Sequence, residues 1–286
     1  MKAVPMLPPK SFGLMNQQVT AVGLGGEGIL RTYGHSNQAL EVIQEALAQG
    51  ITYFDSGRVY AESERYYGSL WEKIPETRAG IFQTSKSAKR DKAGALSDLE
   101  ESLQRLHTDY LDLWQIHDVR TEDELQEIAG PGGALEAFIE ARLSGRVRFI
   151  GVTGHHDPRI LTKAIREWPV DAVMMPVNPV EELLGGFLTS TLPMAKEKGI
   201  AIIAMKTLGA SHYLIPQLGT TAESLIRYAL SHQCTVALVG CSTPEEVRTL
   251  ARAGAEQQTV SEQEKSELLE KFKPYAERLA FYRGTL

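Results

Sequence analysis

TYFDSGRVYAESE, residues 52–64, joins a short apolar strand to the start of an amphipathic run that begins at Glu62. The strand ends in a single carboxylate, Asp55, and a phenol, Tyr60, follows five residues later. An aspartate in this place can cap the next helix, or it can belong to a catalytic site that also includes Tyr60. The same order of strand and helix recurs along the chain and predicts the fold.

Eight apolar runs are predicted as strands, over residues 20–25, 52–55, 80–86, 111–117, 147–154, 172–178, 201–207 and 235–240. Further helices are predicted over 36–50, 92–107, 133–145, 158–168, 221–232 and 242–253, with Ser36 as the N-cap of the first and Gly50 after its last turn. The strands are almost continuously apolar, as expected when helices cover them. Eight strand–helix units with one extra helix over 261–272 predict a (β/α)₈ barrel, with residues 1–286 as one domain.

A doubly wound open sheet is the alternative fold. GLGGEG, residues 23–28, has the glycines of a phosphate-binding turn, but ILRTYGHSN follows it where an immediate helix is expected. We therefore favour the barrel.

The composition excludes several classes of function. The 286 residues carry a formal net charge of -6 and no basic stripe, which argues against nucleic-acid binding. Cys234 and Cys241 lack the spacing of a metal site and suggest a reducing compartment. MKAVPMLPPKSFG, residues 1–13, lacks the apolar core of a signal peptide, and no apolar run has membrane-spanning length. These features predict a soluble cytoplasmic protein without a membrane partner.

Polar side chains stand at the ends of the predicted strands. Asp55, Lys86 and His117 end the second, third and fourth strands, and Thr153, Asn178 and Lys206 end the fifth, sixth and seventh. Singly, Asp55 could be a cap, Lys86 a solvated lysine and His117 a core histidine. In a barrel, however, all of these ends meet at one face, where active sites are built.

These residue types suit carbonyl reduction, which adds a hydride to carbon and a proton to oxygen. A phenol has a pKa near ~10 and needs help to act at neutral pH, and a neighbouring ammonium can lower that pKa by about 1–3 units. Lys86 can supply that charge to Tyr60, Asp55 can hold Lys86, and His117 can orient the substrate oxygen. No side chain donates a hydride, so the four residues imply a nicotinamide nucleotide.

FDSGRVYAESE, TSK and DLWQIH resemble the aldo-keto reductases, and the resemblance extends from VGLGGEG to GCSTPEEV. It implies that Asp55, Tyr60, Lys86 and His117 form a catalytic tetrad with Tyr60 as acid–base. It also implies a (β/α)₈ barrel, a cofactor bound extended without a Rossmann fold, and NADP(H) as the commoner cofactor. The expected substrates are small carbonyl compounds or alcohols, sugars among them. The alternative is a regulatory or channel-associated subunit that binds nucleotide with little turnover.

The chain departs from this family after the fifth strand. Family members often have Ser-Asn there to hold the nicotinamide carboxamide, whereas this chain reads GVTGHHDP, residues 151–158. Thr153 can replace the serine, and His155 or Asn178 could compensate for Gly154. Adjacent side chains in HHD rarely chelate one ion, so no metal is expected. Asp157 before Pro158 is predicted to cap a helix.

Two later segments match the family's phosphate-binding regions. AMKTLGAS, residues 204–211, matches the segment around the pyrophosphate, and VGCSTPEEVRTL, residues 239–250, matches the one around the adenosine phosphate. The expected cofactor contacts there, together with Gly26, are Met205, Lys206, Leu208, Gly240, Ser242, Thr243 and Glu246. Glu245 and Glu246, with Arg248 as the nearby cation, weaken the expectation of NADP(H) and leave NAD(H) open. No iron–sulfur cluster is expected, because the tail to Leu286 lacks cysteines, and the oligomeric state is not indicated.

Overall fold

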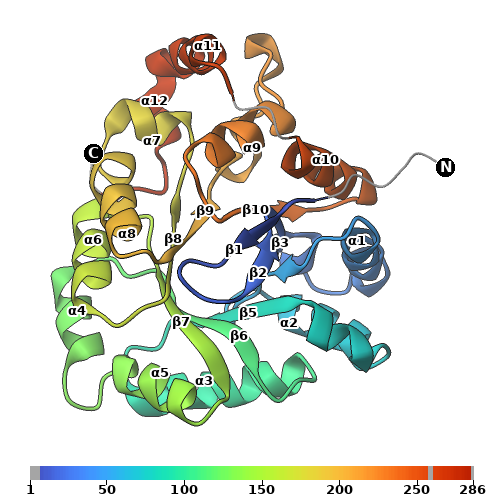
Figure 1. Ribbon diagram of the computed structural model, residues 1–286, viewed down its shortest axis with the longest axis vertical. Helices are drawn as coiled ribbons and strands as arrows, with labels where there is room; N and C mark the ends of the chain where they lie inside the picture. The colour runs from blue at the N-terminus through green and yellow to red at the C-terminus, as the bar shows by residue number, and fades with distance from the viewer. Residues whose placement is uncertain (1–6, 257–259, 285–286) are drawn as a thin grey trace.

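Eight parallel strands close into a barrel in the order β10-β3-β4-β5-β6-β7-β8-β9 in this computed structural model. The ring of strands and the helices around it are seen in Figure 1. The strands are β3 (Val22–Gly28), β4 (Tyr53–Phe54), β5 (Phe82–Ser87), β6 (Leu111–Ile116), β7 (Val147–Thr153), β8 (Ala172–Pro176), β9 (Ala201–Met205) and β10 (Val236–Cys241). All eight predicted strands are present, and the predicted (β/α)₈ barrel is confirmed.

The helices lie outside the strands. They are α1 (Ser36–Ala48), α2 (Ser63–Trp71), α3 (Lys92–Arg105), α4 (Glu122–Ala129), α5 (Ala134–Leu143), α6 (Pro158–Glu167), α7 (Pro179–Leu184), α8 (Leu192–Glu197), α9 (Ala222–Ser231), α10 (Pro244–Ala255), α11 (Glu262–Phe272) and α12 (Ala276–Leu279). The extra helix predicted over 261–272 is α11. No helix in the part of the chain that the structure describes is long and apolar enough to cross a membrane.

The structure describes residues 7–256 and 260–284. Residues 1–6, 257–259 and 285–286 lie outside this description. The expectations for the N-terminal segment, for the tail and for one domain over 1–286 therefore fall partly on residues that are not described.

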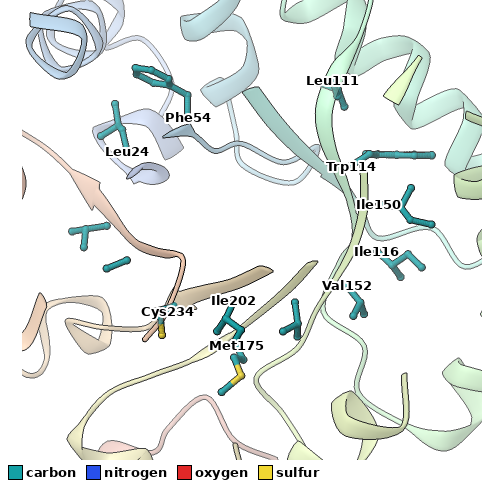
Figure 2. Close-up of a cluster of buried hydrophobic side chains, with 14 of the residues drawn as sticks. Leu24, Phe54, Leu111, Trp114, Ile116, Ile150, Val152, Met175, Ile202 and Cys234 are labelled. Carbon is teal, nitrogen blue, oxygen red and sulfur yellow. The ribbon is translucent and has the colours of Figure 1, made fainter. Parts of the chain in front are cut away.

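Outward-facing apolar side chains of the strands form the main core, which Figure 2 shows in part. Trp114 and Ile116 of β6, with Ile150 and Val152 of β7, are fully buried and belong to one cluster with the helices. Trp114 stacks on Phe138 of α5 with ring centroids 3.6 Å apart. Burial of both strand faces explains the continuous apolar runs in the sequence.

Inward-facing residues alternate with these and define the barrel interior. Phe82 and Leu113 belong to an interior cluster, while Thr84 and Gln115, two residues further along, both hydrogen bond to Asp55. Because side chains alternate along a strand, the next inward positions are Lys86 on β5 and His117, which directly follows β6. Alternation along the strands thus turns these polar residues inward, and the parallel direction of the strands brings them to the same end of the barrel.

A short hairpin at the opposite end was not predicted. β1 (Pro9–Ser11) pairs with β2 (Gln18–Thr20), and Phe12 after β1 is fully buried. Its ring lies 4.6 Å from that of Phe82 and 6.5 Å from that of Tyr53, measured between centroids. The hairpin therefore covers the end of the barrel where the strands begin.

The predicted helix ends are mostly confirmed. Gly50 follows α1 with a φ of +75°, which suits glycine, and Asp157 caps α6 by accepting a hydrogen bond from the Arg159 N–H. The prediction of Ser36 as an N-cap is wrong: Ser36 is the first helical residue, and His35 holds the cap position without a side-chain hydrogen bond.

Candidate active site

Lys86 and Asp55 form a buried ion pair at the end of the barrel where the strands finish. Lys86 Nζ lies 2.6 Å from Asp55 Oδ2 and 2.6 Å from the carbonyl oxygen of Ser56, and both side chains are at most 2% exposed. Asp55 Oδ1 accepts a hydrogen bond of 2.7 Å from Thr84. Burial lowers the pKa of Lys86, and the Asp55 carboxylate opposes this shift.

Tyr60 lies over this pair on the loop between β4 and α2. Its ring centroid is 4.7 Å from Lys86 Nζ and 5.5 Å from the ring centroid of His117. Gly26 makes room for the ring, because a Cβ on residue 26 would lie 2.9 Å from Tyr60 Cδ2. The four predicted catalytic residues therefore lie together at one end of the barrel.

The electrostatics of Tyr60 differ from the expectation. Burial raises the pKa of Tyr60 well above its usual value, and the Asp55 charge raises it further. Lys86 directs its hydrogen bonds to Asp55 and Ser56, so its charge is neutralised there. The prediction that Lys86 lowers the pKa of this phenol is therefore wrong for this arrangement.

His117 is held as a neutral imidazole. Burial, with a smaller contribution from the Lys86 charge, lowers its pKa to about 3. Its backbone is fixed by hydrogen bonds to Ser87 O and from Arg90 Nη1 to His117 O, both of 2.9 Å. A neutral imidazole beside Tyr60 can hydrogen bond to an uncharged carbonyl oxygen.

A cavity of about 460 Å³ lies next to Tyr60 and His117. Its wall is unusually rich in charged and polar groups. The lining residues are Glu27, Arg31, Val59, Tyr60, Ala88, Arg90, His117, Asp118, Arg120, Glu124, Thr153, His155, Met174, Met205 and Lys206. Glu27, Arg31, Arg90, Asp118 and Arg120 were not predicted from the sequence. Glu27 lies near the end of β3 and the other four lie within four residues after a strand, which was the available signal.

Of the expected cofactor contacts, Thr153, Met205 and Lys206 line this cavity. Thr153 Oγ1 accepts a 2.8 Å hydrogen bond from the Asp118 N–H. Leu208 is half-buried and packs against the apolar core. Gly240 lies against Glu27 near the end of β3. A Cβ on residue 240 would lie 2.7 Å from Glu27.

Asn178 is instead part of the internal scaffold. It is 0% exposed and caps α7 through its Oδ1, while its Nδ2 donates to Lys206 O and to the Tyr282 hydroxyl. Because every polar atom of this side chain has a partner within the chain, the expectation that Asn178 compensates for Gly154 finds no support.

The remaining expected contacts lie at the start of α10. Thr243 is the N-cap and accepts a hydrogen bond from the Glu246 N–H, while the Glu246 carboxylate accepts one of 2.5 Å from the Ser242 N–H. Arg248 is paired with Glu245 and Glu45, at 2.9 and 3.1 Å. The Glu246 carboxylate thus occupies the N-terminus of α10, and Arg248, the nearby cation, is already paired with two carboxylates.

Residues 7–256 and 260–284 contain no set of side chains arranged to bind a metal ion. No group of three or more histidine, cysteine, aspartate or glutamate residues is placed there to hold an ion. In the HHD triplet, the Asp157 carboxylate caps α6 by accepting a hydrogen bond from the Arg159 N–H.

Known proteins resemble this chain over most of its length. An uncharacterised oxidoreductase of Bacillus subtilis, YqkF, is 26% identical over 228 residues, which cover 76% of this chain and 70% of the relative. L-galactose dehydrogenase of Arabidopsis thaliana is 24% identical, with 89% of this chain and 92% of that protein covered.

Solved structures show the same fold. The holo form of aldo-keto reductase AKR11C1 from Bacillus halodurans superposes with a TM-score of 0.76 at 19% identity, with 93% of this chain and 96% of that chain covered. An aldo/keto reductase from Klebsiella pneumoniae in complex with NADP and acetate gives 0.74 at 20% identity, with 92% and 95% covered. The sequence model of the aldo/keto reductase family matches residues 21–214. The chain therefore belongs to the aldo/keto reductase family of oxidoreductases.

Proposed function

We propose that this chain interconverts aldehydes or ketones with alcohols, using NAD(P)(H), and that Tyr60 is the acid–base. The observation that carries the proposal is that Tyr60 and His117 line a cavity and that Tyr60 lies over the buried Asp55–Lys86 pair. Sugars and their alcohols belong to the proposed range of substrates, because polar groups dominate the cavity wall.

Each residue has a distinct part in the proposed reaction. A bound nicotinamide nucleotide supplies the hydride that no side chain can donate. His117, neutral at physiological pH, donates a hydrogen bond to the substrate oxygen and orients the carbonyl. Tyr60 transfers its proton to that oxygen in reduction and takes it back in oxidation. Asp55 fixes the Lys86 side chain with Nζ 4.7 Å from the centroid of the Tyr60 ring, and the buried pair thereby positions the phenol.

The cavity has groups suited to a nicotinamide nucleotide. Thr153 and Lys206 provide a hydroxyl and a cation in its wall. Thr153, Met205, Lys206 and Leu208 are proposed to contact the nicotinamide and pyrophosphate portions, and Gly240, Ser242, Thr243 and Glu246 the adenosine portion.

The choice between the two nucleotides rests on opposing arguments. The resemblance to the family implies NADP(H) as the commoner cofactor, and a related structure is described as a complex with NADP. Glu246 on the Ser242 N–H and the neutralised Arg248 both disfavour a 2′-phosphate. We retain NADP(H) as the first choice, with NAD(H) as the alternative.

A direct assay tests the proposal. The protein is mixed with NADPH or NADH and 4-nitrobenzaldehyde, and oxidation of the cofactor is followed by absorbance. Turnover by the wild type and its loss in Tyr60→Phe are expected. Nucleotide binding without turnover on a panel of aldehydes, ketones and sugars would instead support the alternative, a nucleotide-binding regulatory subunit.

A further inference from the structure

Asp118 and His155 face each other in the cavity wall beside His117. Asp118 follows His117 directly in the sequence, and His155 follows β7. Asp118 Oδ1 lies 3.5 Å from His155 Nε2, and both side chains are largely buried, at 16% and 23% exposed. Both residues line the cavity.

His155 presents an acceptor to this cavity. Its Nδ1 lies 3.1 Å from the carbonyl oxygen of Tyr282, which can only accept, so Nδ1 carries the proton. Burial lowers the pKa of His155, although the Asp118 charge opposes the shift, and the ring is therefore neutral at pH 7. In a neutral imidazole protonated at Nδ1, Nε2 has only a lone pair to offer.

Asp118 presents a second acceptor. Its Oδ2 accepts hydrogen bonds from Arg120 Nε and Nη2, at 2.8 and 2.6 Å. Burial favours the neutral acid, but these bonds, together with the charge of Arg120 and the protonated forms of His155 and His117, keep the pKa of Asp118 below its usual value. Oδ1 is buried and has no hydrogen-bond partner among the described residues. Two acceptors thus face each other without a donor between them.

The spacing indicates which donor fits. The two hydrogens of one amino group diverge, and hydrogen bonds near 2.9 Å to both would need acceptors about 5 Å apart. The acceptors here are closer, at 3.5 Å. Hydroxyls on adjacent carbons can lie at a similar spacing, and each can donate to one acceptor. We propose that Asp118 and His155 bind a vicinal diol of the substrate, next to the carbonyl that His117 orients.

This inference rests on the proposed function and narrows its substrates to hydroxylated carbonyl compounds of the sugar type. The rest of the wall suits such a molecule. Glu27 pairs with Arg31 at 2.8 Å and Arg90 with Glu124 at 3.2 Å, and these pairs place both donors and acceptors in the cavity wall. Such a wall has groups to hydrogen bond to further hydroxyls.

A series of three aldehydes tests the proposal. Glyceraldehyde carries two adjacent hydroxyls, lactaldehyde one and propanal none, and kcat/KM is measured for each at the concentration of unhydrated aldehyde. In the wild type kcat/KM should fall at each step, by about 10-fold or more for a hydroxyl bound by a charged acceptor. Equal values for the three aldehydes would overturn the proposal while leaving the proposed function intact, provided that 4-nitrobenzaldehyde is reduced.

Asp118→Asn is the decisive variant. Asparagine tolerates the positive φ of 54° at this position, and its amide can donate to His155 Nε2 and so satisfy the pair internally. The preference for glyceraldehyde over propanal, measured as the ratio of the two kcat/KM values, should fall about 10-fold or more. Asp123→Asn, the same change in the first turn of α4, serves as control and should retain the preference. Weakened cofactor binding with unchanged preference would overturn the proposal and assign the pair to the cofactor.

Binding provides a readout that does not depend on turnover. 1,2-Propanediol has the adjacent hydroxyls that 1-propanol lacks. In nitrogen-15 spectra of the cofactor-bound protein, the diol should shift the Nε2 resonance of His155, and Asp118→Asn should abolish this response. No shift with the diol, or the same shift with 1-propanol, would overturn the proposal even for a protein inactive in every assay.

Discussion

Lys86 Nζ lies 2.6 Å from Asp55 Oδ2, and neither side chain is more than 2% exposed. The pair is surrounded by the inward-facing residues of β5 and β6, so neither charge can be hydrated if the other is removed. Asp55 Oδ1 is in turn held by Thr84. Asp55, the carboxylate at the strand end in the stretch 52–64, is therefore part of the barrel interior, whereas a helix cap would lie at the surface.

Removing one member of this pair should destabilise the protein. Lys86→Met leaves the Asp55 charge buried and unpaired, and the free energy of unfolding should fall by about 3–5 kcal/mol. Asp55→Asn combined with Lys86→Met removes both charges, so the double variant should be more stable than the sum of the single changes predicts. Urea denaturation of the four proteins measures the coupling. Additive effects would contradict a direct interaction between the two charges.

The architecture of the site could be predicted because it depends on local patterns. Apolar runs identified all eight strands, and their alternation carries Phe82, Thr84 and Lys86 to the inner face together. Once the strands are placed, the rule that their ends meet at one face brings Asp55, Lys86 and His117 together.

Other features depend on contacts that no local pattern reports. The three-residue strands β1 and β2 are too short to show an alternation, and Phe12 is identified as core only by the rings that it meets. The pKa of Tyr60 rises because the folded chain buries the phenol near Asp55. Asn178 lies at a strand end as predicted, but its amide donates a hydrogen bond to the hydroxyl of Tyr282, a residue far along the chain.

Glu246 should govern the discrimination between the two nucleotides. Its carboxylate sits on the Ser242 N–H at the start of α10, where it would repel a 2′-phosphate. Glu246→Arg should tighten NADPH relative to NADH by about 10- to 100-fold, the value of one charge contact. Quenching of tryptophan fluorescence during titration gives both affinities. Glu262→Arg, the same reversal in the first turn of α11, should leave the ratio unchanged. Equal shifts for both nucleotides would place Glu246 away from the 2′ position.

His117 should make stability depend on pH. Burial lowers its pKa from 6.5 to about 3, so between these values the unfolded chain binds a proton that the native chain does not. The stability from the neutral ring is fully present above pH 6.5 and is lost as the pH falls towards 3, by about 1.4 kcal/mol per pH unit. His117→Gln removes this dependence. Urea denaturation over a pH series should therefore give converging curves for wild type and variant at low pH, and parallel curves would contradict the burial of a neutral imidazole.

Tyr60→Phe should abolish most of the chemistry and retain binding. The change removes the hydroxyl and keeps the ring that packs on Gly26 and Lys86, so cofactor affinity should persist. Single-turnover reduction with bound reduced cofactor should slow by about 10²–10⁴-fold, as for a lost general acid. Because burial and Asp55 raise the pKa of Tyr60, the phenol is protonated at neutral pH and suited to donate in reduction. The rate of alcohol oxidation, which needs the phenolate, should accordingly rise as the pH increases.

The control for this variant is Tyr110→Phe, which removes the same atom before β6, at the opposite end of the barrel. The Tyr110 ring lies under the guanidinium groups of Arg78 and Arg148, at 4.0 and 4.5 Å, and contributes nothing to the cavity wall. Its single-turnover rate should match that of the wild type. If Tyr60→Phe also transfers hydride at about the wild-type rate, the proton must come from another group. Asp118 and His155 could not supply it directly, because Asp118 is ionised and the proton of His155 is on Nδ1, which donates a hydrogen bond to Tyr282 O. The acid would then be His117, Lys206 or water, and the loop that carries Tyr60 over Lys86 would have a purely structural role.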